Sequence, residues 1–199
     1  FLFDVVRLRV DAWLNPWLDP SDRSFQIVQS LMAVANGGTS GRGPGLGSPG
    51  LVPVAISDFV FVAIAEETGL AGTLGLLALV GFLVSRSLRI ALRAPDGFRR
   101  ILAAGLAAYV GAQTILIIGG NIRLLPLTGV TLPFVSYGGS SLLTSFLALL
   151  ILLFISSQSE EEPAPLPRPR PYLLLAGLIG LGLLALSIIN VWWAVWRGP

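Results

Sequence analysis

Four long apolar stretches divide this chain, covering about residues 68–86, 100–118, 139–156 and 171–193. Each approaches the roughly 20 residues that a helix needs to cross a bilayer's hydrocarbon core. Polar and turn-forming segments separate them. The pattern predicts an all-α, polytopic membrane bundle of about four spans, preceded by a large loop over 4–66 that contains short interfacial helices.

A shorter apolar run, 51–65, precedes the first span and contains the carboxylate of Asp58. Its length is typical of an interfacial or re-entrant helix. Pro53 suits the first helical turn, and Gly69 marks the bend into the span. We therefore expect Asp58 in the second turn of a short helix. The helix N-terminus stabilises its anion, whereas an apolar pocket stabilises the neutral acid. Asp58 is either a general base or a helix-terminal acid paired with an arginine for structural reasons.

The large loop contains two further features. Gln26, Gln29 and Ser30 follow helical spacing on a short amphipathic helix that ends at the glycine pair 37–38. The glycine-rich run GGTSGRGPGLG then resembles a phosphate-binding loop, although it follows no strand and has no Lys-Ser/Thr ending. Two interpretations stay open: its amides and Arg42 meet a phosphate outside the cell, or it is a flexible surface loop.

The segment 119–141 is apolar but interrupted by prolines and glycines, which exclude a continuous helix. Irregular backbone at membrane depth persists only where protein or a water-filled cavity receives it. We expect the segment to fold back and line a cavity with its polar side chains, which are Asn121, Arg123, Thr128, Ser136, Tyr137 and Ser140. Arg123 is its only charge, and pairs with Asp58, binds a substrate phosphate, or extends to the lipid headgroups.

Composition agrees with a membrane protein, since 54% of residues are hydrophobic, only 12% are charged and the mean hydropathy is +0.79. No cysteine or histidine is present, which excludes disulfides, thiol nucleophiles, imidazole bases and the usual zinc ligands. Asp58 and Glu66 project about 80° apart on a helix, so they form no obvious metal-ligand pair. A net charge of +2 is too small to indicate a nucleic-acid partner.

Arginine placement predicts the topology. Five arginines between residues 86 and 100 surround the first interspan connection, and short Arg-rich loops face the cytoplasm. The loop 4–66, the segment 119–138 and the C-terminus then lie outside. The Pro-rich and charged segment 157–170 is expected to be a disordered cytoplasmic linker, leading to an additional membrane helix within 171–199.

Three motifs resemble the SEDS family of cell-wall polymerases, which includes the RodA, FtsW and SpoVE proteins. They are NPWLDP with FQIVQSLMAVANGG, SDFVFVAIAEETGLAG, and LLPLTGVTLPFVSYGGSS. They cover about residues 13–156 and resemble the C-terminal half of a ten-span fold, so we expect residues 1–156 to belong to a longer polymerase core. The chain departs from the family pattern at Ile56, where many relatives have histidine, and at Arg123, where glycine is more usual.

The resemblance implies a peptidoglycan glycosyltransferase that polymerises lipid II at the outer face of the bacterial cytoplasmic membrane, during elongation or division. Asp58 would be the catalytic base, and undecaprenyl pyrophosphate would leave. The substrate-binding candidates are Gln29, Ser30, Arg42, Glu67, Asn121, Arg123, Thr128, Ser136, Tyr137 and Ser140. We expect no metal site built by the protein, although a divalent cation, Mg²⁺ or Mn²⁺, could accompany the substrate pyrophosphate.

The resemblance also implies a partner, since class B penicillin-binding transpeptidases accompany SEDS polymerases and begin with one span of the orientation expected for 171–193. The chain is therefore either part of a fused polymerase and transpeptidase, or has one accessory helix. Two other functions stay open. A flippase or transporter of lipid-linked precursors would use Asp58 as a proton-relay acid, and a non-catalytic scaffold would not need Asp58 at all.

Overall fold

The computed structural model describes residues 2–19, 24–47, 57–158 and 170–196. All of its regular elements are helical. In chain order they are α1 (Leu2–Leu14), the 3-10 helix η1 (Pro16–Leu18), α2 (Phe25–Gly37), α3 (Val60–Arg93), α4 (Gly97–Asn121), α5 (Gly139–Ser157) and α6 (Arg170–Trp196). The prediction of an all-α fold is confirmed.

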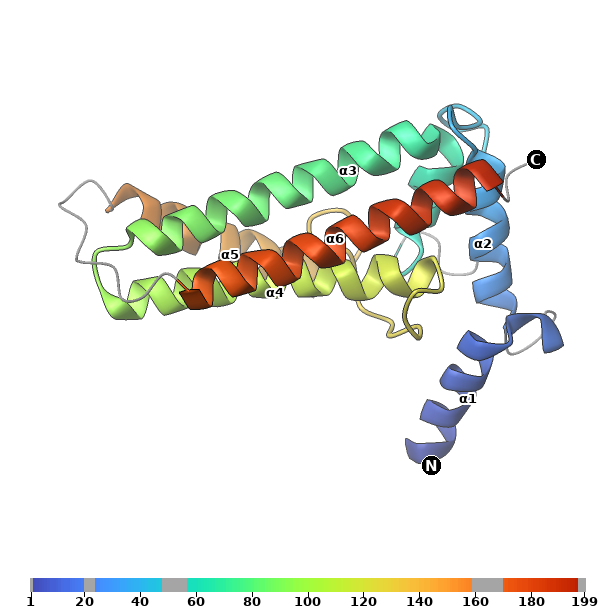
Figure 1. Ribbon diagram of the computed structural model, residues 1–199, viewed down its shortest axis with the longest axis horizontal. Coiled ribbons are helices and arrows are strands. Elements are labelled where there is room, and N and C mark those ends of the chain that lie inside the picture. The colour runs from blue at the N-terminus through green and yellow to red at the C-terminus, as the bar shows by residue number, and fades with distance from the viewer. Residues whose placement is uncertain (1, 20–23, 48–56, 159–169, 197–199) are drawn as a thin grey trace.

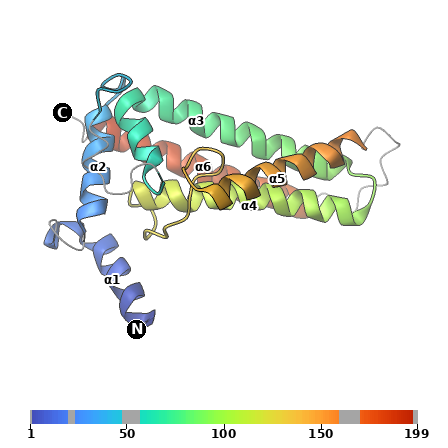
Figure 2. The same ribbon diagram turned by 180° about the vertical axis from the view of Figure 1, so that it is seen from behind.

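Four helices, α3 to α6, are long and apolar enough to cross a membrane. They run along the long axis of the molecule, with α5 and α6 on opposite faces of the α3–α4 pair (Figures 1 and 2). Half of the most apolar window of α4 is buried, against 28% or less in the other three. Helix α4 is therefore the centre of the bundle, and the remaining apolar surface is available to lipid or to further spans.

Helix α2 lies across one end of the bundle, and α1 extends from it (Figure 1). The amphipathic helix predicted around Gln29 is confirmed as α2, which buries its apolar face and ends at Gly37, with Gly38 as the capping residue. A core cluster beneath this end combines side chains of α3, α4, α6 and the segment after α4, namely Phe61, Leu77, Ile117, Ile118, Ile122, Leu132 and Leu186.

The bend predicted at Gly69 is confirmed, because this residue has φ 65° and ψ −158° inside α3. The predicted position of Asp58 is wrong. The helix begins at Val60, so Asp58 lies in the turn just before it rather than in a second helical turn. Pro53 and Ile56 lie outside the described residues.

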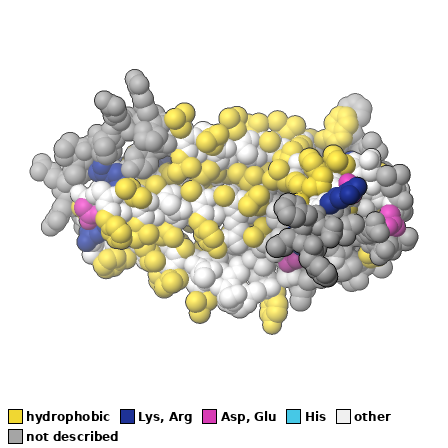
Figure 3. All heavy atoms as spheres, turned by 90° about the horizontal axis from the view of Figure 1, so that it is seen from below, with side chains coloured by type: hydrophobic (Ala, Val, Ile, Leu, Met, Phe, Trp, Pro, Cys, Tyr) yellow, Lys and Arg dark blue, Asp and Glu magenta, His cyan; other side chains and the backbone are white. Residues whose placement is uncertain are grey.

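The interspan connection is shorter than the sequence predicts. Helix α3 continues to Arg93, so Arg86 and Arg89 lie on its last turns. Ala94 is extended before Pro95, which ends the helix, and the Asp96 carboxylate caps α4 by accepting a 2.8 Å hydrogen bond from the Arg99 amide. Charged side chains gather toward the two ends of the face in Figure 3, while hydrophobic ones cover its middle.

Candidate functional site

Two buried polar side chains hold the backbone of the Asp58 turn. The Asn121 amide donates a 3.1 Å hydrogen bond from Nδ2 to the carbonyl of Asp58. The Ser136 hydroxyl donates a 2.6 Å bond to the carbonyl of Ser57 and accepts a 2.8 Å bond from the amide of Leu132. These bonds fix the two peptide groups that flank Asp58, while the side chain of Asp58 stays half-buried.

Asn121 also connects the turn to α2. Its own carbonyl, at the end of α4, accepts a 2.6 Å hydrogen bond from the hydroxyl of Ser30. Both residues are fully buried. Because a buried polar group is costly unless it is hydrogen-bonded, these bonds favour one arrangement of α2, α4 and the Asp58 turn.

The segment after α4 borders the carboxylate of Asp58. It is irregular from Ile122 to Gly138, as the sequence predicts. Gly129 has φ 70°, and a Cβ added there would lie 3.9 Å from Asp58 Oδ2. The left-handed conformation favours glycine at this position, so the segment approaches Asp58 with bare backbone.

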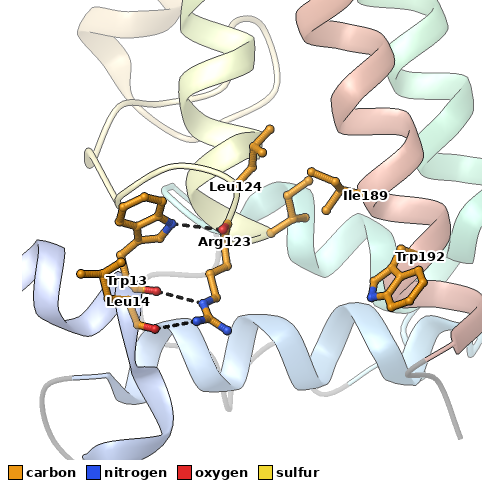
Figure 4. A pocket seen from close by; sticks show the side chains of 7 residues that line it. Trp13, Leu14, Arg123, Leu124, Ile189 and Trp192 are labelled. Carbon is orange, nitrogen blue, oxygen red and sulfur yellow. Dashed lines mark hydrogen bonds between the residues drawn. The ribbon is translucent and has the colours of Figure 1, made fainter.

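Arg123 binds α1 (Figure 4). Its Nε donates a 2.9 Å hydrogen bond to the carbonyl of Trp13, and its Nη2 donates a 2.7 Å bond to the carbonyl of Leu14. The Trp13 indole returns a 3.1 Å bond to the carbonyl of Arg123. A cation at the carbonyl end of a helix is favourable. Within the described residues Asp58 is not among the partners of Arg123, whose guanidinium is instead bonded to these carbonyls.

A cavity of about 320 Å³ lies beside this contact. Its walls come from α1, the segment directly after α4 and the last turns of α6, where Ile189 and Trp192 lie across the cavity from Arg123 (Figure 4).

Arg9 is a residue that no motif in the sequence singled out. Its Nη1 lies 3.4 Å from the carbonyl oxygens of both Leu127 and Thr128, so it reaches the segment that borders Asp58 at Gly129. Its guanidinium is exposed. In the sequence Arg9 stands two residues after Arg7, and nothing in the local pattern marked one of these arginines rather than the other as a site residue.

The glycine-rich run packs on α3 instead of forming an open phosphate cradle. The amides of Arg42 and Gly43 donate 3.0 Å and 2.9 Å hydrogen bonds to the carbonyls of Glu66 and Glu67, and the amide of Gly41 bonds to Gly37. Protein acceptors therefore occupy these three amides, which makes them unavailable to a phosphate. Neither interpretation of this run from the sequence included its contact with α3.

The Arg42 side chain pairs with Glu66. The distance from Nη1 to Oε1 is 3.7 Å, and the Glu66 side chain is 3% exposed against 43% for Arg42. Glu67, next along α3, is half-buried.

The remaining candidates divide into two groups by exposure. Gln29 is half-buried, whereas Thr128, Tyr137 and Ser140 are exposed.

Comparison with known proteins decides the family. The FtsW/RodA/SpoVE family model, described as "Cell cycle protein", matches residues 2–161. The chain belongs to the FtsW/RodA/SpoVE family. The SEDS resemblance of its motifs is thereby confirmed.

Several relatives of this FtsW/RodA/SpoVE chain have stated activities. It is 47% identical over 152 residues to the peptidoglycan glycosyltransferase RodA of Mycobacterium tuberculosis, an alignment that covers 76% of the chain and 32% of that protein. It is 44% identical over 152 residues to the probable peptidoglycan glycosyltransferase FtsW of Geobacter sulfurreducens, an alignment that covers 75% of the chain and 41% of that protein. The chain thus spans well under half the length of these curated relatives.

Proposed function

We propose that this chain forms part of a peptidoglycan glycosyltransferase that polymerises lipid II, with Asp58 as the catalytic base. The observation that supports it most directly is the way the Asp58 turn is held. Asn121 and Ser136 bind its carbonyls, so the backbone is fixed while the carboxylate stays half-buried beside Gly129. A positioned base needs this combination of a fixed main chain and a reachable side chain.

The proposed reaction replaces one C–O bond at the anomeric carbon with another and transfers one proton. The 4-hydroxyl oxygen of the acceptor GlcNAc bonds to the anomeric carbon of the lipid-linked donor. The bond from that carbon to the pyrophosphate oxygen breaks, and undecaprenyl pyrophosphate leaves with the electron pair. The hydroxyl proton passes to the carboxylate of Asp58. General-base assistance of this kind typically accelerates a reaction by about 10² to 10⁴.

The leaving pyrophosphate requires compensating positive charge. Among the arginines of the described residues, Arg9 best fits this role, because its guanidinium is exposed and its 3.4 Å contacts with the carbonyls of Leu127 and Thr128 place it on the segment next to Asp58. Arg123 makes shorter hydrogen bonds, 2.9 Å and 2.7 Å, to the carbonyls of Trp13 and Leu14, and Arg42 pairs with the carboxylate of Glu66. Within the described residues no group of three acidic side chains is assembled for a metal. A divalent cation, Mg²⁺ or Mn²⁺, would therefore be held mainly by the oxygens of the pyrophosphate itself.

The substrate-binding candidates take two roles in this proposal. Ser30, Asn121 and Ser136 are buried at 1% exposure or less and position the Asp58 turn. The other candidates have half-buried or exposed side chains and in this proposal contact the substrate; they are Gln29, Glu67, Thr128, Tyr137 and Ser140.

The proposed orientation places Asp58 at the outer face of the cytoplasmic membrane. The arginines at the junction of α3 and α4, including Arg86, Arg89 and Arg93, lie at the opposite end of α3 from Asp58. Since such arginines favour the cytoplasmic side, Asp58 and α2 would lie outside, where lipid-linked sugars are polymerised.

Helix α6 supports a proposal about a partner. It lies beyond the matched residues 2–161, and it packs on α3 and α4. We propose further that α6 is the membrane span of a class B penicillin-binding transpeptidase fused to the polymerase. Reading the gene beyond Pro199 tests this: a transpeptidase domain with a Ser-x-x-Lys motif is expected, and any other sequence contradicts the fusion.

The activity is tested with the complete protein, purified and supplied with labelled lipid II. Asp58→Asn is expected to form glycan strands at least about 10²-fold more slowly than the wild type. Asp96→Asn is the matched control, because asparagine also caps a helix well and Asp96 lies just beyond the other end of α3. Full-length strands from Asp58→Asn would remove the assigned base. Transfer of lipid II across vesicles without polymerisation would instead favour a flippase.

A further inference from the structure

We propose that Asn190 of α6 is a positioning residue that restrains the Gly69 kink of α3 and thereby the framework around Asp58. The inference rests on the proposed function, in which Asp58 is the base. Its physical basis is a continuous series of hydrogen bonds and close backbone contacts that leads from Asn190 to the Asp58 turn.

The first link is a buried polar contact between spans. Asn190 Nδ2 donates a 2.5 Å hydrogen bond to Thr73 Oγ1 of α3, and the two residues are 117 positions apart. Asn190 is 1% exposed and Thr73 is fully buried. Because hydrocarbon offers no competing water, such interhelical bonds fix the register and orientation of packed membrane helices.

The second link joins Thr73 to the kink. Its Oγ1 donates its one proton to the carbonyl of Gly69, at 3.2 Å, or to that of Leu70, at 3.0 Å. Gly69 interrupts the helical backbone with φ 65°. When the Thr73 oxygen accepts from Asn190, its proton stays directed at these carbonyls. The amide of Asn190 therefore stabilises the rotamer of Thr73 that supports the kink.

The third link joins the kink to α2. The Leu70 amide donates a 3.0 Å hydrogen bond to the carbonyl of Gly38. A Cβ on Gly69 would overlap the backbone at Ser40 and Gly41, so the loop passes directly over the kink. A change in the kink angle would shift this loop and the end of α2, the helix that carries Ser30 and its bond to Asn121.

Close packing holds α6 in place for this role. A Cβ added to Gly111 of α4 would lie 2.9 Å from Ile179 Cγ2, and one added to Gly182 of α6 would lie 2.5 Å from Ile115 Cδ1. Small residues allow such approach between membrane helices. With α6 seated by these contacts, Asn190 is held at the depth of Thr73.

Turnover of the complete protein is the first test. In lipid II polymerisation, Asn190→Ala and Thr73→Val are each expected to lower kcat by roughly 3- to 18-fold. These factors correspond to the free energies measured for interhelical hydrogen bonds in membranes. The double variant should lose no more than either single one, since both remove the same contact. Thr73→Ser keeps the hydroxyl and should restore wild-type turnover. Ser187→Ala is the matched control, because within the described residues its hydroxyl bonds to the carbonyl of Leu183 in its own helix.

Hydrogen exchange supplies a readout that does not depend on Asp58. Peptides covering residues 38–47 and 65–72 should exchange faster in Asn190→Ala and Thr73→Val, and at the wild-type rate in Thr73→Ser and Ser187→Ala. Wild-type exchange and turnover in Asn190→Ala would overturn the inference, and so would a Thr73→Ser variant as slow as Thr73→Val. A fully active Asp58→Asn variant alongside faster exchange in Asn190→Ala would remove the base but retain the restraint.

Discussion

The side-chain amide of Asn121, at the last position of α4, donates a 3.1 Å hydrogen bond to the main-chain carbonyl of Asp58. The two residues are 63 positions apart, and the contact joins the centre of the bundle to the turn that begins α3. Since the Asn121 carbonyl also accepts from Ser30, a single buried residue aligns three elements. Loss of its side chain should therefore disturb the site without touching the carboxylate.

Asn121→Ala is expected to destabilise the protein by about 1 to 3 kcal/mol, because it leaves the carbonyl of Asp58 without this donor. Polymerisation should fall further than stability alone explains, since the Asp58 turn loses its fixed position. Thermal unfolding in detergent and lipid II turnover at a temperature where the variant is folded measure the two effects separately.

Thr114→Val is the control for that prediction. Thr114 is fully buried on the same helix, but among the described residues its hydroxyl bonds to the carbonyl of Val110 one turn earlier, at 2.8 Å. Valine has the same shape, so this variant should keep near wild-type turnover. Equal losses in the two variants would mean that α4 tolerates no buried substitution and that Asn121 has no special role.

Gly69→Ala should destabilise the protein, because Gly69 combines φ 65° with loop backbone directly above it. With ψ at −158°, this positive φ lies in a region that essentially only glycine adopts, and placing another residue there costs about 1 to 3 kcal/mol. The overlap with Ser40 and Gly41 adds to that cost. Gly75→Ala is the matched control on the same helix, since nothing lies within 4 Å of a Cβ there. It should leave stability unchanged or raise it by up to about 1 kcal/mol. Unfolding midpoints in detergent compare the two, and equal midpoints would contradict the account of the kink.

Local signals in the sequence were sufficient to predict where most of the helices lie. The spans, the end of α2 and the bend at Gly69 depend on apolar length, glycine placement and proline exclusion, which act over a few residues. The start of α3 was not predictable in this way. Val60 begins the helix because Asp58 and Ser57 are held in a turn by Asn121 and Ser136, and no local pattern reports such long-range bonds.

The same limit applies to the arginines. Three interpretations of Arg123 were consistent with one charge in an apolar segment, and its side-chain acceptors lie 109 and 110 positions away. Nor did the glycine-rich run reveal that its amides bond to Glu66 and Glu67 of α3. The glycines were consistent with amides that meet a phosphate or with a flexible surface loop, and only the fold specifies that these amides meet α3.

Arg123→Gln should weaken the attachment of α1. It removes charge-assisted hydrogen bonds to the carbonyls of Trp13 and Leu14, so amide exchange around residues 10–18 should rise. The KM for lipid II should stay at the wild-type value, since the guanidinium already binds protein groups. A KM at least about tenfold higher with unchanged exchange would instead place Arg123 on the substrate.

Arg7→Gln is the control for Arg123→Gln. Arg7 lies on α1 itself and pairs with Asp11 at 3.9 Å, but its side chain is 84% exposed. Exposed pairs of this kind contribute little to stability, so exchange and turnover should both match the wild type.

Arg9→Ala tests where the leaving group is stabilised. Within the described residues Arg9 contacts the carbonyls of Leu127 and Thr128, at 3.4 Å, so its loss should barely change the unfolding midpoint. If its charge compensates the pyrophosphate, kcat should fall by about 10-fold or more, because a charged hydrogen bond of roughly 1.5 to 3 kcal/mol is lost in the transition state. Arg9→Lys keeps the charge and should recover part of the rate. Arg7→Ala, two residues earlier on α1, should turn over normally. Wild-type turnover in Arg9→Ala would contradict this role and leave a divalent cation to neutralise the pyrophosphate. In that case, removing the cation with a chelator should abolish polymerisation.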